Sequence, residues 1–321
     1  MRVGQNPAKF VNKVATPERV TVAVLNYIPF LSGFYAEMLD VLKANLKSIR
    51  EQTVYPFDLL VFDNGSCQEV RDYLTEERAL GNIQYLILSE KNLGKGGAWN
   101  MILSGAPGEI IAYTDNDALF KKGWLEKSVK ILETFPKVGM VTARPFRTPP
   151  DFYSSTLAWA DENEEAELES GQIVPFETLN EFNLSLGQTK EFSRDLIEKS
   201  QDYKLTYKNI SAFVGGSHWQ FTAFKEVIAE FLPFEMSRPM GQVRQLDQRM
   251  NEAGFLRLMI DEPLAMNLSN SLEANKVKKA DQGKTGNQRT IKERFFGFPV
   301  IKKPLLYLYN QIFNLYYREN L

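Results

Sequence analysis

The chain contains very little cysteine and histidine, and both scarcities limit the chemistry that it can perform. Cys67 is the only cysteine among 321 residues, so no disulfide can form within the chain. A chain without a disulfide framework agrees with a reducing compartment. His218 is the only histidine, so any imidazole chemistry has to use this residue.

Long apolar runs and a strong net charge are also missing. No run reaches the roughly 18 apolar residues of a membrane span, and the polar residues 1–19 lack the apolar segment of a signal peptide. The formal net charge is −2, so no global field attracts nucleic acid. We therefore predict a cytoplasmic globular protein without a nucleic-acid partner. Its 44% hydrophobic residues are ordinary for that class and can form a substantial core.

Short apolar runs alternate with helical patterns in the first half of the chain. The runs are residues 20–25, 57–62, 83–88, 109–113 and 138–142. Between them lie helical segments at residues 96–104 and 124–135, and a stripe formed by Met38, Leu42, Leu46 and Ile49. This alternation predicts an α/β fold with a mainly parallel central sheet covered by helices on both faces.

Polar residues follow three of the predicted strands. They are Asn26 and Tyr27 after the first, Asp63 and Asn64 after the second, and Asp115 and Asp117 after the fourth. In open α/β sheets, ligands bind beyond the carboxyl ends of the strands. We therefore expect these residues to meet at one ligand-binding edge.

Asp115 and Asp117 form an Asp-x-Asp motif at the end of an apolar strand. Such a pair of carboxylates suits Mg²⁺ or Mn²⁺ carrying a diphosphate. The alternative is an ordinary acidic turn after a strand.

A glycine-rich segment, residues 92–100, precedes a predicted helix. Gly94, Gly96 and Gly97 would let a ligand approach the backbone, the helix N-terminus favours anions, and Lys95 adds a positive charge. The spacing is not that of a P-loop. It is not a dinucleotide fingerprint either, because Trp99 occupies the third glycine position, which disfavours a redox enzyme.

The second half of the chain is less regular. Three prolines fall within residues 145–150, and six carboxylates within residues 161–169 predict a solvated loop or helix face. Beyond them we predict a strand at 213–222, a helix at 223–231, a helix at 241–253 and a strand at 255–260.

The C-terminal part is basic and then aromatic. Residues 276–303 hold nine lysines or arginines against two acidic residues. In the following segment Leu305, Tyr309, Ile312 and Tyr316 share one helical face. A basic linker before such a helix can lie on an anionic membrane surface. Alternatively, the helix packs on the protein's own core or on a second subunit of a homo-oligomer.

Four segments in this order resemble a family 2 glycosyltransferase of the GT-A fold. They are residues 20–27, the tetrapeptide Asp63-Asn64-Gly65-Ser66, residues 92–100, and Asp115-Asn116-Asp117. The resemblance covers residues 20–145 well and the rest loosely. It implies a glycosyltransferase domain over residues 18–270, with a nucleotide-sugar-binding half at 18–145, an acceptor half at 146–270, and a C-terminal helical extension at 271–321.

The implied activity is that of a hexosyltransferase. A sugar would pass, with inversion and with Mg²⁺ or Mn²⁺, from a nucleotide-diphospho-sugar to a hydroxyl of a glycan or lipid-linked acceptor. Polysaccharide biosynthesis at the inner face of a membrane would fit the C-terminal segment.

The resemblance also implies roles for the residues of the donor site. Asp63 would recognise the nucleoside, with Asn26, Tyr27 and Asn64 around it. Asp117 would bind the metal directly, while Asp115 would face ribose or a metal-bound water. Gly94, Lys95, Gly97 and Asn100 would complete the nucleotide-sugar site. Alternatively, Asp63-Asn64-Gly65 is simply a turn sequence and Tyr27 caps the core.

An inverting transfer also needs a carboxylate that takes the acceptor's proton. Asp247 is our candidate, although the usual Glu-Asp pair of the family lies further upstream. Asp247 could instead be an exposed helix residue paired with Arg244 or Arg249. Glu235 is the second candidate for the base.

The resemblance places Gly216, His218 and Trp219 on the acceptor side. For His218, a structural role beside Trp219 is the alternative. Some metal-dependent relatives supply a late histidine ligand, but here Asn267 and Asn270 occupy that region. Water would then complete the metal's coordination shell.

Two rival functions remain open. A sugar nucleotidyltransferase would carry a glycine-rich basic signature after the first strand, where this chain has residues 26–30, Asn-Tyr-Ile-Pro-Phe. A catalytically silent homologue would bind a nucleotide-sugar and act as a scaffold. It would show nucleotide binding without turnover.

Overall fold

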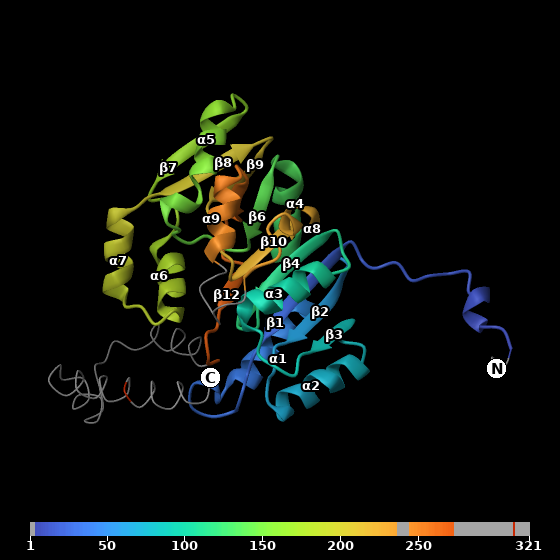
Figure 1. The fold of residues 1–321 in the computed structure, drawn as a ribbon. Helices are drawn as coiled ribbons and strands as arrows, with labels where there is room; N and C mark the ends of the chain where they lie inside the picture. Colours follow the sequence, from blue (N-terminus) through green and yellow to red (C-terminus); the bar gives the residue numbers. More distant parts are fainter. Residues whose placement is uncertain (1–3, 236–243, 273–310, 312–321) are drawn as a thin grey trace. The chain divides into compact units, whose positions relative to one another are not determined.

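The computed structural model describes residues 4–235, residues 244–272 and residue 311. The described residues up to 272 belong to one compact unit (Figure 1). Apart from residues 271, 272 and 311, the predicted C-terminal helical extension lies outside the described residues. The same is true of most of its basic and aromatic segments.

A mixed sheet of ten strands forms the centre of this unit. Its strands are β1 (Val20–Asn26), β2 (Phe57–Asp63), β3 (Tyr85–Leu88), β4 (Ile110–Asp115), β6 (Val138–Thr142), β7 (Ala166–Gly171), β8 (Asp202–Tyr207), β9 (Ile210–Val214), β10 (Gln220–Phe224) and β11 (Leu256–Met259). Their spatial order is β3-β2-β1-β4-β10-β6-β11-β9-β8-β7.

The two halves of the sheet differ in strand direction. The strands β3, β2, β1 and β4 are all parallel, as predicted from their continuous apolar runs. Strand β10 lies antiparallel between β4 and β6, and β11 is parallel to β6. The far edge, β9-β8-β7, is antiparallel. A separate pair, β5 (Ala118–Phe120) and β12 (Ala265–Asn267), brings the end of the unit beside the Asp-x-Asp segment.

Helices cover both faces of the sheet, because alternate strand residues point to opposite sides. Val22 and Val24 of β1 belong to the core shared with α1 (Met38–Gln52), α2 (Gln68–Ala79) and α4 (Trp124–Thr134). Ala23 and Leu25 belong to the core shared with α3 (Gly94–Gly105), α8 (Lys225–Ala229) and α9 (Arg244–Glu252). The predicted fold class, a mixed α/β sheet with helices on both sides, is confirmed.

One predicted strand was wrong in an informative way. Residues 213–222 do not form a single strand, because a turn at residues 215–219 interrupts it between β9 and β10. These two strands run in the same direction but lie on opposite sides of β6 and β11, so the turn crosses between two parts of the sheet. Gly215 has a φ of 131°, and a Cβ at this position would clash with the Thr148 hydroxyl oxygen. The residues Gly215-Gly216-Ser217-His218 break the apolar pattern, but the predicted strand ran through them. This turn carries Gly216, His218 and Trp219.

The acidic stretch at 161–169 is solvated, as predicted, but it is not simply a loop or helix face. It begins at the end of α5 (Ser154–Glu162) and continues into β7, the exposed edge strand. Carboxylates on an exposed edge strand discourage pairing with another chain.

Two further helices, α6 (Phe176–Ser185) and α7 (Lys190–Lys199), connect β7 to β8. Among the described residues, no helix is long and apolar enough to cross a membrane.

Candidate active site

A buried hydrogen-bond network joins the ends of β1, β2 and β4. The Asn26 amide donates to Asp63 Oδ1 over 2.7 Å and to Ser66 Oγ over 3.0 Å. The side-chain oxygen of Asn26, Oδ1, accepts a hydrogen bond from Asn116 Nδ2 over 2.6 Å. The predicted meeting of polar strand-end residues therefore occurs, and it fixes the edge on which the site is built.

Asp63 lies entirely inside this network. Its side chain is 0% exposed, and its second oxygen accepts from the Ser66 backbone N–H over 3.0 Å. These contacts are those of a turn-stabilising aspartate. Nucleoside recognition by Asp63 stays a prediction. Tyr27 is half-buried and packs edge-on against Tyr35, with ring centroids 6.5 Å apart.

Asn64 connects the end of β2 to the glycine-rich segment. Its amide donates to Asn92 Oδ1 over 2.9 Å, and its carbonyl oxygen accepts from the Leu93 N–H over 2.9 Å. Asn92 Oδ1 also accepts from the Gly94 N–H over 2.8 Å. Because α3 begins at Gly94, these bonds set the direction in which the helix presents Lys95.

The other predicted donor-site residues on α3 have structural neighbours. Gly97 is buried within the helix. Asn100 donates to the Phe234 carbonyl over 2.8 Å and accepts from the Phe234 N–H over 2.6 Å. Its amide therefore anchors the segment that follows α8, and a contact from it to a nucleotide stays a prediction.

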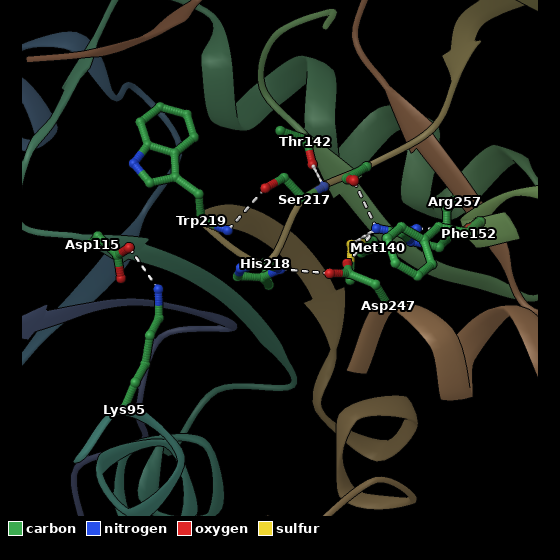
Figure 2. Close-up of polar contacts among 11 residues, drawn as sticks. Lys95, Asp115, Met140, Thr142, Phe152, Ser217, His218, Trp219, Asp247 and Arg257 are labelled. Atoms are coloured by element: carbon green, nitrogen blue, oxygen red, sulfur yellow. Dashed lines mark hydrogen bonds and ion pairs between the residues drawn. The ribbon is translucent and has the colours of Figure 1, made fainter. Parts of the chain in front are cut away.

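Asp115 and Lys95 form a close ion pair at the centre of the predicted donor site. Lys95 Nζ lies 2.6 Å from Asp115 Oδ2, and both side chains are largely buried (Figure 2). Asp115 Oδ1 accepts from the Tyr113 hydroxyl over 2.5 Å. Burial, reinforced by the charge of Asp115, holds the pKa of Tyr113 well above its usual value, so Tyr113 remains a donor.

Asp117 lies in a less favourable environment for a charge. Burial and the neighbouring charge of Asp115 raise the pKa of Asp117 to about 6. Its Oδ1 accepts from the Trp219 indole N–H over 3.0 Å. A hydrogen bond from its own backbone N–H and the charge of Lys95 partly oppose this increase in pKa. The Leu268 N–H donates to the Asp117 backbone carbonyl over 2.7 Å, so the segment around Asn267 does lie beside this residue.

The donor set at Asp115 and Asp117 fits a hard divalent cation that keeps several of its waters. Among the described residues, no group of three or more histidine, cysteine or acidic side chains could hold a metal. One or two carboxylates together with diphosphate and water form a coordination shell that Mg²⁺ takes in proteins, and Asp115 and Asp117 could supply the carboxylates. The side-chain oxygen of Asn267 accepts a hydrogen bond from the Ser269 N–H, and the side-chain amide of Asn270 donates to the Phe34 carbonyl.

Trp219 lies closer to the metal residues than its predicted place on the acceptor side suggests. Its indole contacts Asp117, while its backbone N–H donates to Ser217 Oγ over 3.2 Å. The preceding residue, His218, faces the other way, toward α9 (Figure 2). The turn after β9 therefore connects the predicted metal site with the predicted base.

Asp247, the predicted base, is a buried residue with two charged or polar partners. It is 3% exposed, and its Oδ2 lies 2.5 Å from His218 Nδ1. Its Oδ1 accepts from Arg257 Nη2 (Figure 2). The alternative in which Asp247 is exposed and paired with Arg244 or Arg249 is wrong. Arg249 donates instead to the Phe231 carbonyl over 2.9 Å.

Arg257 is a residue of this site that the sequence did not identify. It is 0% exposed and donates to the carbonyls of Gly216 and Phe152, each over 2.7 Å. Burial lowers the pKa of Arg257, although the Asp247 carboxylate opposes this effect. The only indication in the sequence was an arginine within the short apolar strand Leu256–Met259. A charged side chain in a buried strand needs a partner of opposite charge, which would have pointed to a nearby carboxylate.

His218 and Asp247 line an open cavity of about 310 Å³. Its other walls are largely apolar and include Phe146, Phe152 and Phe182. Glu235, the second candidate for the base, is exposed and borders residues 236–243, which lie outside the described residues. Asp247 is therefore the candidate base that faces a cavity.

Comparison with known proteins shows similarity to glycosyltransferases. Residues 33–181 match the sequence model of glycosyl transferase family 2. An uncharacterized glycosyltransferase of Nostoc sp. is 28% identical over 123 residues, which are 38% of this chain and 35% of that protein. An uncharacterized glycosyltransferase of Methanocaldococcus jannaschii is 31% identical over 31% of this chain and 34% of its own length. The matched region spans about a third of these relatives.

A third relative and one solved structure complete the comparison. The putative teichuronic acid biosynthesis glycosyltransferase TuaG of Bacillus subtilis is 26% identical over 29% of this chain and 37% of its own. The mannosyltransferase of Pyrobaculum calidifontis, in complex with GDP-Man and Mn²⁺, overlaps 80% of this chain and 60% of its own at a TM-score of 0.46 and 17% identity. By the match to the family sequence model and the curated relatives, residues 33–181 of this chain are similar to glycosyl transferase family 2.

Proposed function

We propose that this protein is a metal-dependent, inverting glycosyltransferase. It moves a sugar from a nucleotide-diphospho-sugar to a hydroxyl of a glycan or lipid-linked acceptor. One observation carries the proposal: the consecutive residues His218 and Trp219 contact, respectively, the candidate base Asp247 and the candidate metal ligand Asp117. In this proposal, one short turn would link the donor site to the proton acceptor.

The donor would bind at the carboxyl edge of the parallel strands. The N-terminus of α3 and Lys95 offer positive charge to a diphosphate. Asp117, with Asp115, would hold Mg²⁺ or Mn²⁺. When bound, the ion stabilises the negative charge that develops on the departing nucleoside diphosphate. Lys95 would share that task.

The acceptor hydroxyl would approach from the cavity beside α9. As its oxygen attacks the anomeric carbon, the proton has to pass to a nearby base. Asp247 and the histidine that it contacts form this base in our proposal, and Glu235 is the second candidate. Attack from the face opposite the leaving diphosphate gives inversion.

The acceptor class is supported by the sequence and by one relative. Residues 276–303 are basic, and residues 305–317 are rich in apolar and aromatic side chains. Such a segment would hold the enzyme at the inner face of an anionic membrane, where lipid-linked acceptors lie. The relative from B. subtilis is named for teichuronic acid biosynthesis, which favours a surface polysaccharide precursor as the acceptor.

A catalytically silent, nucleotide-sugar-binding homologue is the second candidate function. The observation in its favour is that both oxygens of Asp247 already have partners. It would bind nucleotide without turnover, and Asp247→Asn would leave its properties unchanged. A sugar nucleotidyltransferase is less well supported, because β1 is not followed by a glycine-rich basic loop.

Calorimetric titration with UDP, GDP and dTDP, with and without Mn²⁺, tests the proposed donor site. We expect one nucleotide to bind in a metal-dependent manner and Asp117→Ala to abolish the metal-dependent part. Asp195→Ala, an exposed residue of α7, is the matched control and should bind like the wild type. No binding by folded wild-type protein would mean that the Asp-x-Asp segment is only a turn.

A further inference from the structure

Asp247 is poorly placed to take a proton from a substrate directly. Only 3% of the residue is exposed, and each carboxylate oxygen is already in contact with a nitrogen, one from His218 and one from Arg257. Arg257 itself is completely buried and would lose its only charged partner among the described residues if Asp247 turned away. Breaking a buried pair of this kind is strongly destabilising, because it leaves an uncompensated charge in the interior.

His218 is better placed than Asp247 to meet a substrate. Its side chain is 28% exposed, against 4% for that of Asp247, and it lines the same cavity. Because Nδ1 faces the carboxylate, the second ring nitrogen, Nε2, is the one left for a ligand. No contact of Nε2 occurs within the described part of the chain. The imidazole is therefore held at one nitrogen and free at the other.

The turn that carries His218 is fixed on both sides. The Ser217 N–H donates to the Thr142 hydroxyl over 2.9 Å, and the Gly216 carbonyl accepts from Arg257. The Trp219 indole donates to Asp117, and the Trp99 ring lies edge-on to the imidazole with centroids 6.4 Å apart. A ring held in this way loses little orientational freedom when a substrate arrives.

We propose that His218 Nε2 is the atom that accepts the acceptor's proton, while Asp247 and Arg257 are positioning residues. The inference rests on the proposed transferase function. Asp247 would accept the Nδ1–H bond, which leaves the Nε2 lone pair available, and Arg257 would compensate the carboxylate's charge. A carboxylate that orients an imidazole in this way also stabilises the imidazolium that forms.

The step balances as a single displacement. The acceptor oxygen forms a bond to the anomeric carbon as its proton moves to His218 Nε2. The bond from that carbon to the diphosphate oxygen breaks, and its electron pair leaves with the nucleoside diphosphate. The imidazolium then returns its proton to solvent through the open cavity.

The first test uses the fact that His218 is the only histidine in the chain. In nitrogen-15 NMR of wild-type protein labelled at histidine, the imidazole signals all come from His218, so they need no further assignment. We expect a neutral ring at pH 7.5, protonated at Nδ1 and bare at Nε2. Protonation at Nε2, either as the other tautomer or as an imidazolium, would overturn the proposal whatever the activity.

The second test measures release of nucleoside diphosphate from UDP-, GDP- and dTDP-sugars, with water as the acceptor. A base supplies roughly 10²–10⁴-fold in rate. His218→Gly should therefore lower kcat by about that factor, keep nucleotide affinity, and regain part of the rate with added imidazole. His218→Gln should show the same loss without rescue, because its side chain fills the space.

The outcomes separate this inference from the proposed function. Unchanged kcat in His218→Gly, or a lowered kcat that imidazole does not restore, would overturn the role of His218 alone. No release by the wild type from any donor would instead overturn the transferase function. Asp247→Asn should lower kcat and alter the NMR tautomer while imidazole gives no rescue, because the histidine is still in place.

Discussion

At the scale of single residues, Asp117, the proposed metal ligand, has an environment that lowers the stability of the folded protein. Burial and the charge of Asp115 raise its pKa to about 6, from an ordinary value of 3.8. Between these two values the folded protein binds a proton more tightly than the unfolded chain does. The metal-free protein should therefore lose stability as pH rises from about 4 to about 6.

Replacement of Asp117 by asparagine should remove this pH dependence. We expect metal-free Asp117→Asn to have a higher Tm than the wild type at pH 7 and a similar Tm at pH 4. Mn²⁺ should raise the Tm of the wild type only, and this gain should shrink below pH 6, where the carboxylate is protonated. Thermal melts at the two pH values measure both effects. A variant less stable than the wild type at pH 7 without metal would contradict the account.

Several candidate site residues could be selected from the sequence, but the contacts that they make could not. Asp115 and Asp117 were identified because they end an apolar strand. The ion pair of Asp115 with Lys95 agrees with the predicted donor site. Arg257 was missed, because its importance depends on Asp247, ten residues earlier and on a different element.

At the scale of elements, the turn after β2 and the loop before α3 fit together through a glycine. Gly65 has a φ of 89°, and a Cβ at this position would lie 3.0 Å from the backbone nitrogen of Asn92. The Lys91 carbonyl carbon would lie at the same distance of 3.0 Å. Because both atoms belong to the backbone, neither can rotate away. The loop that leads to Lys95 is therefore packed directly against the end of the strand.

Gly65→Ala should cost more than its backbone strain alone. Gly81 provides the matched control: its φ is 79°, but no atom lies within 4 Å of a Cβ placed there. Both alanine variants should lose about 1–2 kcal/mol of unfolding free energy from the left-handed backbone. Only Gly65→Ala should lose more than this and also bind nucleotide more weakly. Chemical denaturation and nucleotide titration check the two effects, and equal behaviour of the two variants would contradict the argument.

The elements themselves were largely predictable where their patterns were local. The stripe of Met38, Leu42, Leu46 and Ile49 became the buried face of α1. The break between β9 and β10 was missed, because the apolar residues on both sides were assigned to one strand although Gly215, Gly216 and Ser217 are turn-forming residues. Strand β7 was also missed, since an exposed edge strand lacks the alternating apolar face of an ordinary strand.

At the scale of the whole molecule, the proposed membrane contact depends on residues beyond the compact unit. Deletion of residues 304–321 should abolish co-sedimentation with vesicles that contain anionic lipid, and it should leave nucleotide affinity unchanged. Neutral vesicles are the control, because the expected attraction is partly electrostatic. Equal association of the full-length and truncated chains with anionic vesicles would contradict the proposal.

The sequence by itself determined the local features: the apolar strands, the helices between them, and the polar residues at the strand ends. These follow from hydrophobic periodicity, which acts within about ten residues of the chain. Tertiary structure alone decided which of these polar groups would meet. Trp219 reaches Asp117 across 102 residues, and His218 reaches Asp247 across 29. Such pairings depend on the order in which strands join the sheet, because that order places β10 next to β4, with β6 and β11 beyond it.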